Sequence, residues 1–268
     1  MTPNPPSNGN GNGNSPLATI QGLTRAAKNR RPRVVWSIEA FGKCGKTHLA
    51  FSAPEPIVYW NIDRGEEGTI EKFLDQGKEI YQYDIPMTRD MLAGTPEQVM
   101  RKCEPELRKF LASFDAVTKT IGHPRGPKTL IIDTFGDLFT LGCLALIGKN
   151  EKIMPMERTR VNSLFAGLVR EAFYYDANLL LLHKLTEWDG KVKPSGFNQV
   201  EFLVQAIVRC EKKVKKTVGG GSEHSFVYTI QNCRHNTELE GESYDSKRYG
   251  FAELASEIID GTSPDDWR

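Results

Sequence analysis

The chain has 268 residues, 39% of them hydrophobic, which is enough for one or two domains with a sizeable core. Lys and Arg number 35 against 34 Asp and Glu, so the net charge does not indicate binding to nucleic acid or to a membrane. Only local clusters of charge can indicate such binding. The five cysteines are dispersed without a CxxC pair, which argues against a disulfide framework and favours a reducing compartment.

The N-terminal segment predicts no fold of its own. Residues 1–16, MTPNPPSNGNGNGNSP, contain too little apolar surface to offset the entropy of ordering and are typical of a disordered tail. Residues 25–33, RAAKNRRPR, carry five basic side chains, either as a solvated leader or as a contact for nucleic acid or another subunit. The segment does not resemble a signal peptide, and the longest apolar run, 179–182, is too short to cross a bilayer. We therefore expect a cytoplasmic protein with no membrane partner and a tail over residues 1–30.

From residue 33 onward, apolar runs alternate with helical stretches. The apolar runs predict strands buried on both faces, at 33–39, 57–62, 129–133 and 179–183. The helical candidates between them begin near Lys46 and near Glu66, and span 96–118 and 157–175. Strands separated by helices predict a three-layer α/β fold with a mostly parallel sheet. After Gln199, two strands joined by a GGGS turn predict a C-terminal antiparallel extension, followed by a short helix and an acidic end in 251–268.

The segment EAFGKCGKTHLA, residues 39–50, resembles the phosphate-binding pattern G-x-x-x-x-G-K-[ST], with Ala40 at the first glycine position. A strand enters it and a helix leaves it, as the pattern requires, so successive backbone N–H groups can hold an anion. Lys46 is expected to bind the β- and γ-phosphates, and the hydroxyl of Thr47 to hold Mg²⁺. The predicted nucleotide-binding residues are Gly42, Lys43, Cys44, Gly45, Lys46, Thr47 and His48.

A second acidic element follows the strand TLIID. Asp133 ends this strand, and ligands of an open parallel sheet bind at the carboxyl ends of its strands, so Asp133 is expected to reach the Mg²⁺ shell. The alternative is a helix N-cap. Four dispersed residues could be imagined as zinc ligands, but their spacing matches no common zinc motif: Cys210, His224, Cys233 and His235.

Taken together, GKCGKTHLAFSAPEPIVYWNIDRGEEGTIEKF, TLIIDT and LLLLHK resemble the phage-encoded RecA-like ATPases, a group of minimal recombinases and single-strand annealing proteins. The resemblance implies a RecA-type ATPase core over residues 31–240, followed by an acidic C-terminal segment over 241–268. It implies ATP and Mg²⁺ as cofactors, and single-stranded DNA and further copies of the chain, in a ring or filament, as partners. A single-strand binding protein is a further candidate partner. For a phage-encoded protein the compartment is the cytoplasm of the host.

The resemblance also implies catalytic roles. Gly65 stands where such proteins carry the glutamate that activates water, so Glu67 is the first choice for this role and Asp63 the second, ahead of Glu66. The alternative for these acids is a charged first helical turn. His183 stands where a polar residue senses the γ-phosphate, and Arg234 where a cation reaches a neighbouring subunit's γ-phosphate. An ordinary strand-end histidine and a surface salt bridge are the competing interpretations.

The segment KLTEWDGKVKPSGFNQ, residues 184–199, interleaves basic and aromatic side chains and is predicted to be a mobile loop. Such a loop suits single-stranded DNA, because lysines neutralise phosphates and rings stack on bases. The expected DNA contacts are Lys184, Trp188, Lys191 and Lys193. The alternative is an exposed loop with a hydrophobic anchor.

The sequence thus predicts a P-loop ATPase that acts on single-stranded DNA in recombination or annealing. Two alternatives remain open. One is a nucleotide-binding module that does not hydrolyse ATP, which Ala40 and Gly65 favour. The other is a motor or helicase loader that acts on protein partners.

Overall fold

The computed structural model describes residues 32–65, 68–149, 155–216 and 222–268, and Pro32–Arg268 form a single compact unit. The predicted tail of residues 1–30 lies outside the described residues.

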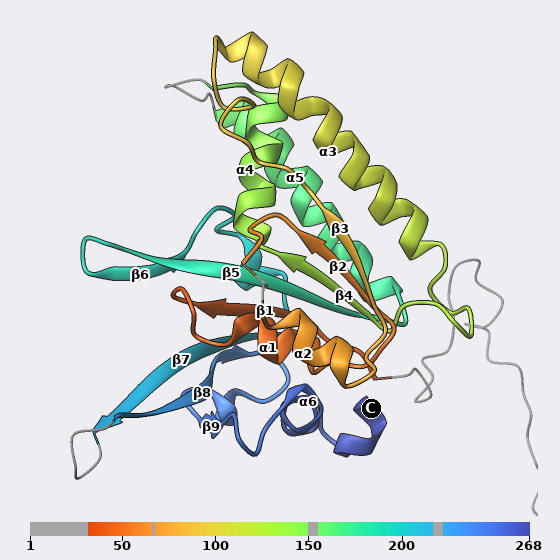
Figure 1. Ribbon diagram of the computed structural model, residues 1–268, viewed down its shortest axis with the longest axis vertical. Helices are drawn as coiled ribbons and strands as arrows, with labels where there is room; N and C mark the ends of the chain where they lie inside the picture. Colours follow the sequence, from red (N-terminus) through yellow and green to blue (C-terminus); the bar gives the residue numbers. More distant parts are fainter. Residues whose placement is uncertain (1–31, 66–67, 150–154, 217–221) are drawn as a thin grey trace, which may run out of the picture. The chain divides into compact units, whose positions relative to one another are not determined.

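Within these ranges the strands form one nine-stranded sheet in the order β3-β2-β4-β5-β1-β7-β8-β9, with β6 paired to β5 (Figure 1). The strands from β3 to β7 along this order are parallel, whereas β8 and β9 pair antiparallel to their neighbours. The strands are β1 (Val35–Ala40), β2 (Ile57–Asn61), β3 (Ile80–Asp84), β4 (Thr129–Asp133), β5 (Asn178–Trp188), β6 (Lys191–Pro194), β7 (Ala206–Lys216), β8 (Ser222–Cys233) and β9 (Ser243–Asp245).

Helices cover both faces of the sheet. The helices are α1 (Lys46–Phe51), α2 (Ile70–Asp75), α3 (Pro96–Thr118), α4 (Phe135–Leu146), α5 (Pro155–Glu171) and α6 (Phe251–Ile258). Buried side chains of α3, α4 and α5 belong to one apolar cluster, and those of α1, α2 and α6 to another. Short 3-10 helices complete the described chain at Ala172–Tyr174, Val200–Phe202, Thr237–Leu239 and Pro264–Trp267.

The alternation of side chains along the central strands explains the two layers. In β1, Val35 contributes to the cluster under α3–α5, whereas Trp36 and Ile38 contribute to the cluster under α1 and α6. Successive side chains of a strand point to opposite faces, so a strand covered on both faces must be apolar at nearly every position. This confirms the predicted three-layer α/β fold with its antiparallel C-terminal extension.

The structure adds elements that the sequence pattern does not predict, chiefly β3, α4, β6 and β9. The acidic C-terminal segment contains the expected short helix, α6, and Phe251, Leu254 and Trp267 from this segment are buried in the same core as β1. None of the helices in the described ranges is both long and apolar enough to cross a membrane.

Candidate nucleotide-binding site

The predicted phosphate-binding loop joins the carboxyl end of β1 to α1, as the pattern requires. Gly45 adopts a positive φ of 90° immediately before the helix, a conformation that favours glycine. The backbone N–H of Leu49 donates to the carbonyl of Gly45 over 3.0 Å and closes the first helical turn. Lys46, the first residue of α1, is buried.

Thr47 and Asp133 meet at the edge of the sheet where β1 and β4 end. The Thr47 hydroxyl donates to Oδ2 of Asp133 over 3.1 Å, and the Tyr59 hydroxyl donates to the same oxygen over 3.2 Å. The N-cap of α4 is Thr134, whose Oγ1 accepts from the backbone N–H of Asp137 over 3.2 Å. Asp133 is therefore not the helix cap, and its carboxylate faces the phosphate loop.

Burial raises the pKa of Asp133 to about 6, even though the nearby Lys46 ammonium and the hydrogen bond from Thr47 lower it. A carboxylate that is 4% exposed and held mainly by hydroxyl groups lacks full charge compensation. Hard oxygen ligands of this kind, a threonine hydroxyl and a carboxylate, suit Mg²⁺. The two residues therefore fit the metal role predicted for them.

A cavity of about 740 Å³ opens above this pair. Its lining includes every predicted nucleotide-binding residue from Gly42 to His48, together with Asp63, Gly65 and Asp133. Further lining residues come from elements distant in sequence and are not predicted as site residues by the sequence: Thr69, Lys72, Phe226, Tyr228 and Ser246. The cavity therefore combines a polar floor with an aromatic wall contributed by β8.

Lys184 also lines this cavity, although the sequence predicts it as a DNA contact. Its ammonium lies 2.6 Å from Oδ1 of Asp63 and 3.3 Å from Oδ2 of Asp137. Burial lowers the pKa of Lys184, but the two carboxylates outweigh it and the net direction is upward. Lys184 thus carries a positive charge that bridges two acids at the rim of the phosphate cavity.

Of the three acids considered for activating water, the structure describes one. Asp63 lines the cavity and is paired with Lys184. Glu67 and Glu66 lie outside the described residues.

His183 is fully buried beneath the site and is not among the residues that line the cavity. Its Nδ1 lies 3.0 Å from the Ser37 hydroxyl, and among the described residues its Nε2 has no hydrogen-bond partner. Burial, with a smaller contribution from the nearby Lys46 charge, lowers the pKa of His183 to about 4. The predicted role of His183 in sensing the γ-phosphate therefore stays a prediction.

Arg234 lies at the opposite edge of the sheet from the phosphate loop. It follows β8, whose last residue pairs with the first residue of β7, and its backbone N–H donates to the Gln205 carbonyl over 2.9 Å. Its guanidinium donates to the carbonyl of Phe202. Within one chain Arg234 is therefore remote from the cavity, and its predicted role in a neighbouring subunit stays a prediction.

The predicted mobile loop after His183 is a β-hairpin made of β5 and β6, which projects beyond the end of β1 (Figure 1). Asp189 and Gly190 at its turn have φ of 53° and 69°, the positive values that two-residue hairpin turns favour. Lys191 and Lys193 are exposed on β6, whereas the Trp188 side chain lies outside the described part of the chain. Phe197 is 1% exposed and packs against Phe135 and Phe139, so its ring is a core anchor and not a stacking surface.

The return of the hairpin to the core depends on a close backbone contact. A Cβ on Gly136, in the first turn of α4, would lie 2.5 Å from the Ser195 carbonyl oxygen. Only glycine at this position lets the segment after β6 cross so near the start of α4. The hairpin is thus fixed to the helix that begins directly after Asp133.

No protein-family model matches the sequence, and no curated protein is significantly similar to it. Among solved structures, a KaiC-like protein from the hyperthermophilic archaeon Pyrococcus horikoshii is similar over 79% of this chain and 84% of that chain, with 14% sequence identity and a TM-score of 0.40. A similarity at this level does not assign an activity to the chain, so the residues of the site carry the functional conclusion.

Proposed function

We propose that this chain binds ATP with Mg²⁺ in the cavity above the phosphate loop, hydrolyses it, and uses the bound nucleotide in its action on single-stranded DNA. The observation that carries the nucleotide part is the meeting of Lys46, Thr47 and Asp133 at one cavity, with Thr47 and Asp133 joined by a 3.1 Å hydrogen bond. Lys46, Thr47 and Asp133 supply the cation, the hydroxyl and the carboxylate that a nucleoside triphosphate requires, although 86 positions separate Thr47 from Asp133.

Each residue has a distinct part in this proposal. The loop binds phosphate oxygens through its backbone N–H groups, and Lys46 neutralises the negative charge on the β- and γ-phosphates. Thr47 and Asp133 would hold Mg²⁺, which offsets charge on the phosphates when bound. Glu67, or Asp63 in second place, would accept the proton of the attacking water.

Specific observations favour a second candidate function, in which ATP is bound but not hydrolysed. The Asp63 carboxylate is paired with Lys184 over 2.6 Å, which neutralises the one described acid proposed to orient water. Ala40 and Gly65 also depart from the pattern of hydrolysing enzymes. These features favour the second candidate, in which ATP is a ligand that controls assembly and DNA binding without being hydrolysed.

One experiment tests both candidates. Nucleotide dissociation constants and phosphate release are measured with and without single-stranded DNA, for the parent protein, Lys46→Ala and Lys119→Ala. Lys119 is the matched control, because its side chain is exposed, does not line the phosphate cavity and carries the same charge. We expect Lys46→Ala to lose nucleotide binding while Lys119→Ala keeps it.

The outcomes are separable. Equal nucleotide affinity in the parent and in a folded Lys46→Ala protein contradicts the site itself. Tight binding without phosphate release, even when DNA is present, supports the non-hydrolysing candidate.

A further inference from the structure

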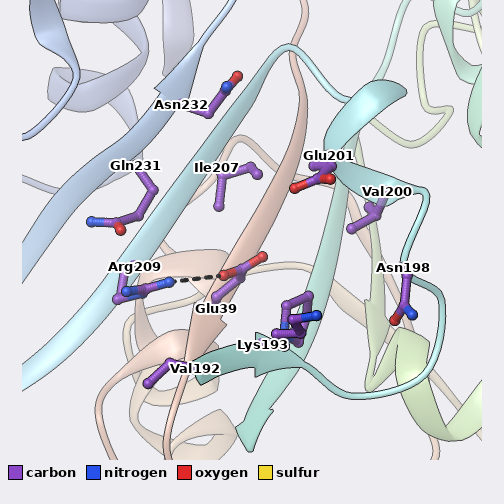
Figure 2. Close-up of a pocket in the computed structure, with 11 residues that line it drawn as sticks. Glu39, Val192, Lys193, Asn198, Val200, Glu201, Ile207, Arg209, Gln231 and Asn232 are labelled. Carbon is purple, nitrogen blue, oxygen red and sulfur yellow. Dashed lines mark ion pairs between the residues drawn. The ribbon is translucent and has the colours of Figure 1, made fainter. Parts of the chain in front are cut away.

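A second cavity of about 380 Å³ lies at the base of the β5–β6 hairpin and shares no lining residue with the phosphate cavity. Its floor consists of Glu39 on β1 and of Ile207 and Arg209 on β7. Lys193 on β6 and Glu201 on the following segment form one wall. Figure 2 shows these side chains gathered around Glu39 and Arg209.

The floor contains a charged pair with incomplete hydrogen bonding. Glu39 is 3% exposed, and its Oε2 lies 3.6 Å from Nη2 of Arg209, beyond the range of about 2.7–3.2 Å for a good hydrogen bond. The Nε of Arg209 is buried and has no partner among the described residues. Within the described ranges, the other oxygen of Glu39 accepts one long hydrogen bond, of 3.4 Å, from the Ser37 hydroxyl.

Such a pair is costly for the free protein, since a buried donor without an acceptor loses its hydration and gains nothing in return. The Nε atom itself is inaccessible, but the Arg209 side chain is 24% exposed and lines an open cavity with Glu39, so a ligand there can accept from the accessible part of the guanidinium. That ligand must accept a hydrogen bond from the guanidinium and, beside this acceptor, donate one to the carboxylate. Every nucleobase presents an adjacent acceptor and donor on its edge.

The surroundings agree with a nucleobase. Three amide side chains line the same cavity and can pair with base edges of either polarity: Asn198, Gln231 and Asn232. The volume falls within the range of about 300–1,000 Å³ for small-molecule pockets, which is ample for one base.

The lysines near the cavity favour a base that belongs to a strand. Lys193 lines the wall, Lys191 is exposed two residues away on β6, and Lys213 is exposed on β7 on the same face as Arg209. Exposed lysines spaced around a pocket can contact consecutive phosphates while one base enters it.

We propose that this cavity binds a single nucleobase through Glu39 and Arg209, and that the base is supplied by single-stranded DNA. The proposal deepens the DNA part of the proposed function and rests on it. A free nucleoside presents the same edge, and the test separates the two sources. Because all four bases offer the required pair of groups, the site selects little among sequences, as a protein acting on any single strand requires.

The test compares a thymidine oligonucleotide with an abasic oligonucleotide of equal length. We expect the parent protein to bind the thymidine strand about tenfold or more tightly, as one well-placed pair of base contacts provides. Arg209→Gln should bring this ratio close to one. Lys213→Gln, four residues along the same face of β7, is the matched control, and it should keep the ratio while lowering the salt slope of binding by about one.

Arg209→Gln changes a partly buried residue and could disturb folding, so a second variant at an exposed position tests the same cavity. Asn232 is exposed on β8 and borders the cavity, so Asn232→Ile should narrow the cavity and replace one of its amide groups with a β-branched side chain, without disturbing the core. It should lose the base preference as Arg209→Gln does. Equal binding of the two strands by the parent, or an unchanged ratio in folded Asn232→Ile, overturns the proposal and leaves phosphate-mediated DNA binding intact.

If neither strand binds, the DNA part of the proposed function fails. The binding of free thymidine then shows whether the cavity accepts a nucleobase. Its binding is measured in the Lys46→Ala background, where the phosphate loop is disabled, with and without Asn232→Ile. Binding that Asn232→Ile abolishes supports a nucleobase site for a free nucleoside, whereas no binding overturns the inference.

Discussion

Asp133 shows how burial and charge oppose each other at a single residue. The fold places its carboxylate beside Lys46 and Thr47, but also removes it from water, and the net effect raises its pKa to about 6. A protein that used this position only for stability would gain by carrying a neutral side chain there. The retained acid is consistent with the proposed Mg²⁺ role.

This shift makes a prediction about stability and pH. The unfolded chain releases the Asp133 proton near pH 4, whereas the folded protein releases it near pH 6, so the folded state binds more protons between these values. The contribution of protonated Asp133 to the free energy of unfolding is therefore fully present below about pH 4, and it is lost as the pH rises through about 6. Relative to the parent protein, Asp133→Asn should gain about 2 kcal/mol of unfolding free energy between pH 4 and pH 7.

Denaturant unfolding of both proteins across this pH range, without nucleotide, provides the measurement. Other groups titrate in the same range, and taking the difference between the two proteins removes their contribution. A difference that does not change with pH would mean that Asp133 has an ordinary pKa.

Lys184 provides a second residue-scale prediction. Its ammonium offsets the carboxylates of Asp63 and Asp137 at the rim of the phosphate cavity. Lys184→Ala would leave two uncompensated acids near the triphosphate, and we expect nucleotide affinity to fall about three- to tenfold. DNA affinity without nucleotide should stay the same. Lys184→Arg keeps the charge and is the control for both titrations.

The opposite pattern, weaker DNA binding with unchanged nucleotide affinity, would return Lys184 to the role that the sequence suggests.

The sequence identifies Lys46, Thr47 and Asp133 because each belongs to a short motif with its own physical meaning. It does not identify Tyr59 or Phe226, which reach the site only through strand order. No local pattern encodes such contacts.

At the scale of elements, buried strands and long amphipathic helices are the most predictable. The predicted helix over 96–118 coincides with α3, whose Thr95 and Gln98 form a reciprocal capping box before a periodic apolar face. The helix α4 is not predicted, because FGDLFTLGCLAL is apolar on most sides and lacks a helical period. The edge strand β3 is exposed at most positions and lacks the apolar run that marks the central strands.

The β5–β6 hairpin tests how an element contributes to DNA binding. Lys191 and Lys193 are exposed on its second strand, and paired strands hold these charges in a more defined position than a mobile loop would. We expect Lys191→Gln with Lys193→Gln to flatten the salt slope of single-stranded DNA binding by one to two units. The nucleotide dissociation constant should not change, since neither side chain lines the phosphate cavity.

Binding isotherms at several salt concentrations, with and without a non-hydrolysable ATP analogue, give the slope. Lys109→Gln with Lys119→Gln, both on or next to α3 and away from the hairpin, removes the same charge and serves as the control. An equal change of slope in the two double variants would indicate a general charge effect with no special role for the hairpin.

At the scale of the whole molecule, the order of the strands separates two predicted parts of one active site. The phosphate loop follows the carboxyl end of β1, while Arg234 follows β8 at the amino end of β7, which runs parallel to β1. One chain therefore cannot bring Arg234 to its own cavity without unfolding the sheet. If this arginine stabilises the γ-phosphate, it does so in a second copy of the chain.

This separation leads to a test with mixed subunits. Arg234→Ala and Lys46→Ala proteins should each be inactive in ATP hydrolysis, because every interface lacks either the arginine or the lysine. In an equal mixture, about a quarter of the interfaces pair an intact loop with an intact arginine, and activity should recover to about that fraction. Phosphate release across a series of mixing ratios, with mixed assemblies verified by pull-down of a tagged subunit, measures the recovery.

The contact of Arg234 with the Phe202 carbonyl provides the competing explanation, in which Arg234→Ala only loosens the edge of the sheet. A local structural defect cannot be repaired by adding a partner with a damaged phosphate loop, so recovery in the mixture excludes it. Arg108→Ala, which removes an exposed arginine paired with Glu104 on α3, should be fully active alone and marks the effect of losing a surface charge. Mixed assemblies that show no recovery at any ratio would leave Arg234 with its structural contact alone, and the γ-phosphate would then depend on Lys46 of the same chain.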